Sequence, residues 1–554
     1  MAAEAPKGPT DEAASTAPLA LTAEEDPSAP AAPPPAESVA SLLGDEPQEN
    51  LLTLIAIPKG LIQRLFGVSA APLYAEFLGS FILAMTYVCV DVTRDLAFYS
   101  AGVPLMVLVL MCGLASVSGG HFNPAVSLCV GLSNKGRWRV LAKYMAVQFL
   151  GGVLGVLWAT ALYGLRAQGL QPRLETTGDM TYPALAAFFV EFLFTSMWCF
   201  VHLNVTLSQA NNPIDEGNQF FGLALGFVLL GGNLEGQQVS GAFFNPAIAF
   251  GVTLPRFSNS VGWMMFYFVA YSLASLNAAL LFRLLRGSES DSRTEAKSVP
   301  QLVVAEGTGA FIRSYLFGMG LGTEKPMGAI SSGAAIAAMI YAVSDISGAH
   351  FNPLVTLAVY VDGRKGLSWQ RSVMYVLTHL VSAILGVLCY SLVHHADLYS
   401  AETTRKLEPV HMLRMLVGEF IFSFMLGYVV LATLVNKGID APGSRNHFFG
   451  LAVGSTVALS SIVLHFGGGG CINPATKLGA QLVFSSLTPG SGFTWASIAV
   501  ELLGASLGAA IYPIINEAAS CDYLDGLDDE GESLAKPTGA PQALPTSTKA
   551  SSSA

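Results

Sequence analysis

The stretch "SGGHFNPAVSL", residues 118 to 128, interrupts an apolar run that begins near residue 101. Gly and Pro both disfavour a helix interior, so the stretch does not continue the preceding apolar helix. Asn is a preferred N-cap and Pro a preferred first helical residue, so Asn123 and Pro124 predict the start of a second, short helix. The glycines before them allow the backbone to turn back. The stretch therefore predicts a re-entrant loop that leads into a half-helix.

The Asn-Pro pair recurs three times in comparable Gly-rich, apolar settings. These are "VSGAFFNPAIAFG" around Asn245, "ISGAHFNPLVTLA" around Asn352 and "GGGGCINPATKLG" around Asn473. Asn123 and Asn352 are 229 residues apart, and Asn245 and Asn473 are 228 apart, so a unit of this length is duplicated. Within each unit the two pairs are 122 and 121 residues apart. Each unit therefore consists of two repeated half-units. Because each half-unit has an odd number of spans, the two half-units are predicted to cross the membrane in opposite orientations.

The composition indicates a polytopic membrane protein. Of the 554 residues, 52% are hydrophobic and 12% are charged, and no segment is basic enough to predict a nucleic-acid partner. The net charge of -11 arises in two acidic tails that are rich in Pro, Ala and Ser, a composition that predicts disorder. The seven cysteines contain no C-x-x-C pair, so no disulfide framework is predicted.

Twelve segments are long and apolar enough to cross a membrane. They lie at about 72–92, 101–118, 138–164, 183–205, 217–233, 260–286, 300–320, 326–346, 367–394, 410–435, 446–465 and 493–515. An even count places both termini on one side, and the basic loops identify that side as the cytoplasm. The predicted organisation is a tail (1–66), a first unit (67–286), a cytoplasmic linker (287–298), a second unit (299–516) and a tail (517–554).

One carboxylate lies early in a predicted span of each half-unit. The four are Glu76, Glu191, Glu306 and Glu419. They could form a proton relay, because an ionisable residue inside a span is a functional candidate. The favoured interpretation is structural: each carboxylate accepts backbone N–H groups that the re-entrant loop leaves without partners. His121 and His350 have no further ligand residues at metal-binding spacing, so we predict no metal site and no cofactor.

The four Asn-Pro boxes resemble those of the aquaporin and aquaglyceroporin family, the major intrinsic proteins, and the chain resembles two such channels fused in tandem. The resemblance covers about residues 70 to 516 and implies an all-α polytopic fold with six transmembrane helices and two re-entrant half-helices per unit. The residues that match the family's pore motifs are Asn123, Pro124, Ala125, Asn245, Pro246, Ala247, Asn352, Pro353, Leu354, Asn473, Pro474 and Ala475.

The resemblance also implies a function. We expect a passive channel, and no enzyme, that carries water and small neutral solutes such as glycerol or urea across a lipid membrane. The positive ends of the half-helices would oppose protons at mid-bilayer, because each helix N-terminus carries a partial positive charge. Channels of this family assemble as tetramers of one-pore units, so two tandem chains are expected to form a homodimer with pseudo-tetrameric symmetry.

Several residues depart from the family's pattern. Carried over by spacing, the narrowest point is lined by Val103, Asn233, Ala242 and Ile248 in the first unit, and by Ser332, Ser461, Gly470 and Thr476 in the second. The filter arginine is absent from both sets, since Ile248 and Thr476 occupy its place. Helical geometry turns the adjacent Lys477 away from this ring. Arg313 follows Glu306 by seven residues on the same helix face, which predicts an internal ion pair.

Two other functions remain open from the sequence. A twelve-span secondary transporter also uses internal repeats and broken helices, and it would show saturable, ion-coupled uptake. A structural, junction-type membrane protein with poorly conducting pores is compatible with the missing filter arginine and with Leu354 in place of Ala.

Overall fold

The structure is a computed structural model of the chain. It describes residues 70–92, 96–163, 176–177, 180–181, 183–209, 211, 220–254, 257–287, 297–322, 326–363, 366–393, 409–435, 448–464, 471–484 and 491–529. The predicted tail at 1–66, most of the linker at 287–298 and the filter position Gly470 lie outside these residues.

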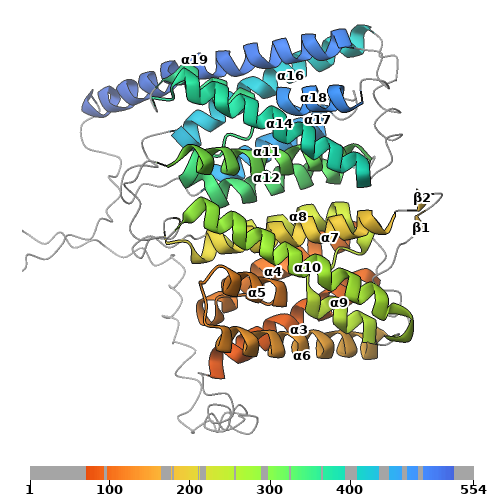
Figure 1. Ribbon diagram of the computed structural model, residues 1–554. Coiled ribbons are helices and arrows are strands. Elements are labelled where there is room, and N and C mark those ends of the chain that lie inside the picture. Colours follow the sequence, from red (N-terminus) through yellow and green to blue (C-terminus); the bar gives the residue numbers. More distant parts are fainter. Residues whose placement is uncertain are drawn as a thin grey trace, which may run out of the picture. The chain divides into compact units, whose positions relative to one another are not determined.

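The first half of the chain is helical throughout its described spans (Figure 1). Its long helices are α3 (Ala70–Val92), α4 (Leu96–Ser118), α6 (Trp138–Tyr163), α7 (Ala184–His202), α8 (Phe221–Ser240) and α10 (Phe257–Arg286). The two half-helices are α5 (Pro124–Leu132) and α9 (Pro246–Thr253). A π-helical turn, η3 (Leu203–Leu207), extends α7, and the two-residue strands β1 (Thr176–Thr177) and β2 (Met180–Thr181) pair antiparallel between α6 and α7.

The second half repeats this order. Its long helices are α11 (Val299–Gly322), α12 (Pro326–Ser347), α14 (Trp369–Val393), α16 (Pro409–Val430), α17 (Phe449–Leu464) and α19 (Ser491–Asp529). The half-helices are α13 (Pro353–Asp362) and α18 (Pro474–Val483), and η5 (Leu431–Val435) extends α16 as η3 extends α7. Helix α19 continues to Asp529, beyond residue 517 where we predicted the tail to begin.

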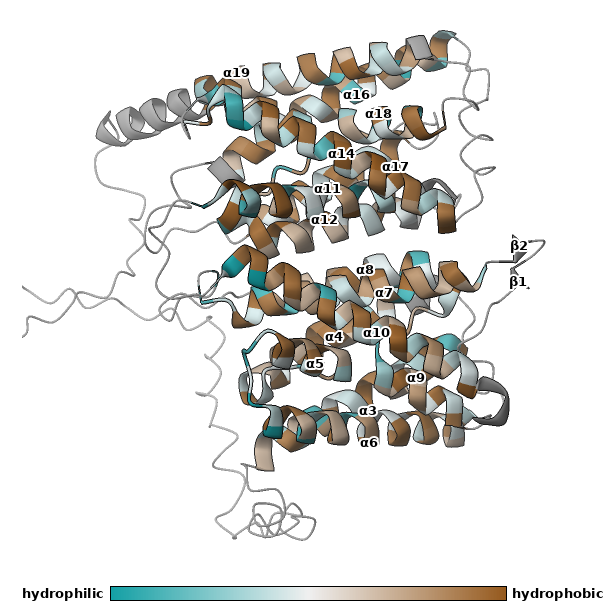
Figure 2. Cartoon of the chain, viewed as in Figure 1, coloured by the Kyte–Doolittle hydropathy of each residue, from teal (hydrophilic) through white to brown (hydrophobic). Residues whose placement is uncertain are grey.

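The predicted all-α polytopic fold is confirmed. Among the described residues, nine helices are long and apolar enough to cross a membrane, and hydrophobic residues, drawn in brown in Figure 2, are frequent along the helices. The other three predicted spans are the helices α8, α11 and α17. Helix α17 is short, with 16 residues, and α8 and α11 carry buried polar side chains such as Asn233, Glu235, Glu306 and Arg313. Helix α17 is apolar but short, whereas α8 and α11 are less apolar because part of their surface faces polar groups inside the protein.

Close approach of helices depends on glycines at equivalent places in the two halves. A Cβ atom on Gly151 of α6 would lie 2.5 Å from the carbonyl oxygen of Phe77, and one on Gly155 would lie 2.3 Å from that of Phe81. In the second half, a Cβ atom on Gly386 of α14 would lie 2.6 Å from the carbonyl oxygen of Phe311. The G-x-x-x-G pattern at 151–155 therefore brings α6 against the backbone of α3.

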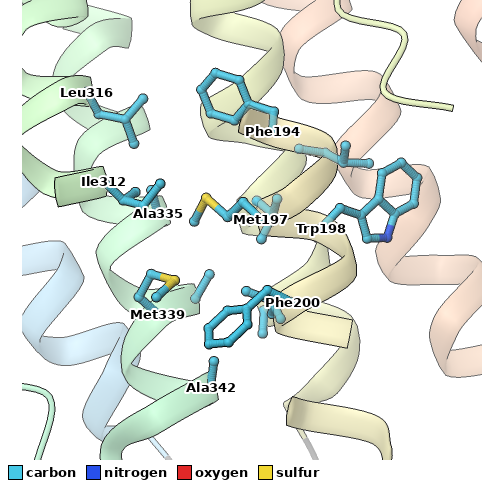
Figure 3. Close-up of a cluster of buried hydrophobic side chains, with 14 of the residues drawn as sticks. Phe194, Met197, Trp198, Phe200, Ile312, Leu316, Ala335, Met339 and Ala342 are labelled. Carbon is cyan, nitrogen blue, oxygen red and sulfur yellow. The ribbon is translucent and has the colours of Figure 1, made fainter. Parts of the chain in front are cut away.

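Helices α7 and α8 of the first half pack against α11 and α12 of the second. Phe194, Met197 and Phe200 of α7 point toward Ile312 and Leu316 of α11 and toward Ala335, Met339 and Ala342 of α12 (Figure 3). At one edge of this apolar contact, the Arg286 guanidinium pairs with Asp345 and donates to the Ala342 carbonyl at 3.0 Å. Its Nε also donates to Asn204 Oδ1 at 3.0 Å. The two halves thus share one buried core with an ion pair at its border.

Candidate functional site

Each half-helix begins where the Asn-Pro pair predicts. In all four, Asn is the N-cap with extended backbone and Pro is the first helical residue. The Asn side-chain oxygen accepts the N–H of the second helical residue, at 2.9 Å for Asn123 and Asn245 and at 3.0 Å for Asn352 and Asn473. The predicted capping is therefore confirmed, and Leu354 is accommodated without loss of the cap.

The half-helices of each unit meet at their N-termini. Asn123 Nδ2 donates to the Phe244 carbonyl and Asn245 Nδ2 donates to the Phe122 carbonyl, both at 2.9 Å. Figure 1 shows α5 and α9 approaching end to end. The second unit repeats the exchange: Asn352 Nδ2 donates to the Ile472 carbonyl at 2.8 Å, and Asn473 Nδ2 to the Phe351 carbonyl at 3.3 Å.

Each Asn amide uses one of its two N–H groups in this exchange. An amide nitrogen carries two donors, and no second bond of these Nδ2 atoms is recorded within the described part of the chain. All four Asn side chains are at most 1% exposed. The arrangement holds pairs of oriented donors at the junction of two helix N-termini, where the helix dipoles make the potential positive.

Glu76 holds the loop that precedes α5. Its Oε1 accepts from Ser118 Oγ at 2.6 Å and from the His121 N–H at 2.9 Å, and its Oε2 accepts from the Phe122 N–H and from Gln148 Nε2, both at 2.7 Å. The side chain is fully buried. Four donors compensate the charge, so this carboxylate has the structural contacts that the sequence favoured over a proton relay.

Glu191 and Glu306 repeat this network. Glu191 accepts from Ser240, from the N–H groups of Phe243 and Phe244, and from the Tyr271 hydroxyl at 3.0 Å. Glu306 accepts from Ser347 and from the N–H groups of His350 and Phe351, and it contacts His379 Nε2 at 2.8 Å. Three of the four predicted carboxylates therefore secure a re-entrant loop through the same set of atoms.

Glu419 differs from the other three. In the described part of the chain its recorded partners are side chains: Lys477 Nζ at 2.6 Å from Oε1, and Ser497 Oγ. The loops before α5, α9 and α13 place Phe122, Phe244 and Phe351 at φ values of 48° to 52°, in the left-handed region. Ile472, at the equivalent position before α18, has no positive φ. A β-branched residue pays a larger steric penalty there, which accounts for a different loop.

Lys477 is neutralised by two carboxylates. Its Nζ lies 2.6 Å from Glu419 Oε1 and 2.8 Å from Glu501 Oε1, and both acids are at most 1% exposed. The side chain thus points to α16 and α19. Charged side chains that are paired inside the protein in this way do not add a free positive charge to the filter ring.

Most donors of these networks were not predicted from the sequence. A serine stands five residues before the motif Asn in three boxes, at Ser118, Ser240 and Ser347, and Gly468 replaces it in the fourth. A tyrosine hydroxyl donates to the carbonyl of each of these serines, from Tyr144, Tyr267 and Tyr375. The residue four positions after each tyrosine is the fourth partner of the carboxylate. These residues are Gln148, Tyr271 and His379. The recurrence of Ser in the aligned boxes was a signal that could have identified the first of these groups.

The filter positions differ between the units in polarity. Val103, Ala242 and Ile248 are buried and apolar, and both amide atoms of Asn233 are buried without a hydrogen-bond partner among the described residues. In the second unit, Thr476 is buried and its hydroxyl exchanges a 2.8 Å hydrogen bond with Ser314, while Ser332 is 5% exposed. Ser461 is half-buried on α17.

The predicted ion pair between Arg313 and Glu306 is wrong. Glu306 is satisfied by His379 and by the loop donors, and Arg313 Nη2 instead donates to the Ile472 carbonyl at 3.3 Å. A spacing of seven residues places both on one face of α11 but about 10 Å apart along the axis, so each side chain finds a nearer partner. Arg313 therefore lies at the half-helix junction.

The two histidines of the loops have packing contacts. His121 Nδ1 lies 3.0 Å from Ser127 Oγ, and its ring packs edge-on against Tyr144 and His202. His350 Nδ1 lies 3.0 Å from Thr356 Oγ1 and its ring packs against Tyr375. Within the described residues, no group of three or more His, Cys, Asp or Glu side chains is arranged to hold a metal ion.

Comparison with known proteins identifies what this arrangement is similar to. The sequence model described as "Major intrinsic protein" matches residues 68–270, 180–321 and 323–515. The chain is 32% identical over 225 residues to aquaporin NIP1-4 of Oryza sativa subsp. japonica. The matched region covers 39% of this chain and 77% of that protein. It is 29% identical over 221 residues to glycerol uptake facilitator protein-like 6 of Lactiplantibacillus plantarum, which covers 39% of this chain and 97% of that protein. Among solved structures, the aquaglyceroporin of Plasmodium falciparum aligns with a TM-score of 0.34 and 21% identity over 38% of this chain and 94% of that one.

Proposed function

Because the chain belongs to the major intrinsic protein family and is an integral multi-pass membrane channel for water and small solutes, we propose that each half forms one pore. The observation that carries this proposal is the reciprocal exchange between Asn123 and Asn245, repeated by Asn352 and Asn473. Each exchange fixes two half-helix N-termini against each other and leaves one oriented N–H per Asn for the oxygen of a permeant.

Proton exclusion follows from the same geometry. A proton or cation at the junction meets the positive ends of two helix dipoles, each equivalent to roughly half a charge. A water molecule that accepts from both Asn amides is held in one orientation, which interrupts a chain of hydrogen-bonded waters. Neutral molecules with a hydroxyl, carbonyl or water oxygen are therefore the permeants that this junction favours.

The two filters predict different solute preferences. The ring of Val103, Asn233, Ala242 and Ile248 offers an entering solute one amide and otherwise apolar walls. A solute that loses its hydration there recovers few hydrogen bonds, which raises the barrier for glycerol or urea. The ring of Ser332, Ser461, Gly470 and Thr476 is small and polar, so such solutes lose less in the second ring.

Osmotic measurements on proteoliposomes test the channel. We expect water flux well above that of empty vesicles, with part of it lost in Val103→Trp, part in Ser332→Trp and nearly all in the double variant. Leu162→Trp is the control, because Leu162 is 62% exposed on α6, which is not part of a filter ring. Flux at the level of empty vesicles would favour the structural, junction-type protein, whereas saturable uptake driven by an ion gradient would favour a secondary transporter.

We also propose that two chains form a homodimer with four pores. Within one chain, α7 and α8 of the first half contact α11 and α12 of the second. The equivalent helices α3 and α4 of the first half and α16 and α17 of the second present exposed apolar side chains, among them Leu105, Val109, Val417 and Leu459. Joining these surfaces between two chains would repeat the internal contact and close a ring. Native mass spectrometry in detergent should give a mass of two chains.

A further inference from the structure

Helix α11 carries a buried arginine that the first half lacks. Arg313 is 5% exposed although it lies within a helix of the membrane-spanning region. Leu83 occupies the equivalent position in α3, because each residue follows the loop-binding carboxylate, Glu76 or Glu306, by seven positions. An arginine inside the membrane is costly, and such residues normally face the protein interior and serve the transport path.

The guanidinium lies at the junction of the two half-helices. Its Nη2 donates at 3.3 Å to the carbonyl of Ile472, the residue before the motif Asn473. The same carbonyl accepts Asn352 Nδ2 at 2.8 Å. Arg313 therefore shares an acceptor with one of the two amides that we propose as the centre of the second pore.

The neighbouring residue ties α11 to the filter position itself. Ser314 Oγ lies 2.8 Å from Thr476 Oγ1, and Thr476 stands where the family's filter arginine would be. The first unit has apolar residues at all three equivalent positions, each at most 1% exposed: Leu83, Ala84 and Ile248. The second unit has replaced this apolar contact with Arg313, Ser314 and Thr476. Arg313 and Ser314 are adjacent in α11, and Ser314 contacts Thr476, so the three polar replacements lie at one place in the second unit.

Most of the guanidinium's donors have no hydrogen-bond partner among the described residues, which do not include the adjoining residues 465–470. A guanidinium carries five N–H groups, and one hydrogen bond from Arg313 is recorded within the described residues. Glu501, an acid of α19, is already the partner of Lys477, whose Nζ lies 2.8 Å from Glu501 Oε1.

We propose that Arg313 is the specificity-determining cation of the second pore, and that it replaces, from α11, the arginine missing at position 476. This inference rests on the proposed function of the second half as a pore. The guanidinium narrows the lumen at the half-helix junction, adds a positive charge that opposes protons, and donates to the oxygen of a passing water. The second pore therefore passes water in preference to glycerol, despite the small polar ring at its filter.

Substitution of Arg313 in a chain whose first pore is closed by Val103→Trp tests this role. In proteoliposomes we expect Arg313→Leu to raise the ratio of glycerol to water permeability by about tenfold. The proton leak should also rise by about tenfold. Each change corresponds to a barrier lower by about 1.4 kcal/mol. Arg313→Lys should keep the proton leak at the level of the background, because it preserves the charge. Arg371→Leu, on an exposed residue of α14, is the matched control.

The reciprocal variant protects the test against misfolding of Arg313→Leu. In a chain whose second pore is closed by Ser332→Trp, Leu83→Arg should lower glycerol permeability of the first pore by about tenfold. Unchanged ratios in Arg313→Leu, in protein that elutes like the background chain, would overturn the proposal. So would a second pore that conducts neither solute before or after Arg313→Leu. Flux through the unmodified chain distinguishes a failure of the Arg313 proposal from a failure of the channel proposal. The channel proposal is contradicted only if the unmodified chain shows no flux of water or solute.

Discussion

Lys477 provides the sharpest test of the charge arrangement in the second unit. We predict that Lys477→Met destabilises the protein, because it leaves Glu419 and Glu501 buried without their shared cation. The ammonium lies 2.6 Å and 2.8 Å from these carboxylates, and both are at most 1% exposed. Removal of one partner of a buried ion pair costs about 3 to 5 kcal/mol, and here two carboxylates lose their partner.

The measurement is the apparent melting temperature of detergent-solubilised protein, followed by size-exclusion chromatography after heating. A loss of this size should lower the apparent Tm by about 3 to 4 °C, because a chain of 554 residues has an unfolding entropy of about 1.2 kcal/mol/K. Lys143→Met is the matched control, since Lys143 is a half-buried lysine of α6 with no recorded ion pair among the described residues. It should change the apparent Tm little.

A second substitution distinguishes lost charge compensation from lost packing. Glu501→Gln removes one of the two carboxylates, so the double variant Lys477→Met/Glu501→Gln should recover roughly half of the lost stability or more. An unaltered apparent Tm in Lys477→Met would refute the reasoning. Equal instability of the single and double variants would show that the lysine acts by its volume and not by its charge.

Three further outcomes follow from contacts elsewhere in the chain. Asn204 begins the glycosylation acceptor sequence Asn-Val-Thr, but it should carry no glycan in eukaryotic expression, because it is fully buried and accepts a hydrogen bond from Arg286. A shift in mass on glycosidase treatment would contradict this. Gly155→Leu should prevent correct folding, since its side chain meets the Phe81 carbonyl, and fluorescence-detected chromatography should show aggregates. Gly262→Leu on α10, where nothing lies within 4 Å, should elute normally. Arg286→Ala should lower stability by about 2 to 4 kcal/mol, read as a lower apparent Tm, because it leaves the aspartate between the two halves without its partner.

The repeated part of the architecture could be predicted from the sequence. Asn-Pro boxes at intervals of 228 and 229 residues identify the duplication, and the capping preference of Asn predicts where each half-helix begins. These features depend on local chemistry, so the residue types carry them directly. The role of Glu76 as an acceptor of loop N–H groups was also predictable, because a buried turn needs a partner for its backbone donors.

The contacts between distant residues could not be predicted in the same way. The spacing of Glu306 and Arg313 suggested an ion pair, but helix periodicity does not reveal that His379, 73 residues away from Glu306, competes for the same carboxylate. Likewise, Lys477 finds Glu501 through the packing of α18 against α19. A long side chain selects its partner from everything within its reach, and that set is defined by tertiary packing.

The second re-entrant loop of the second unit concentrates the departures from the repeat. Gly468 stands where the other three loops have a serine, and Ser497 stands where they are contacted by a tyrosine. The acid Glu501 replaces the glutamine, tyrosine or histidine that is the fourth partner of the carboxylate. An acid beside Glu419 would be repelled unless a cation separated them, and Lys477 lies between the two. One cation between two carboxylates thus stands where the equivalent loop of the first unit has the single carboxylate Glu191. Because any of these three charges alone would be buried without compensation, Lys477, Glu419 and Glu501 form one interdependent set.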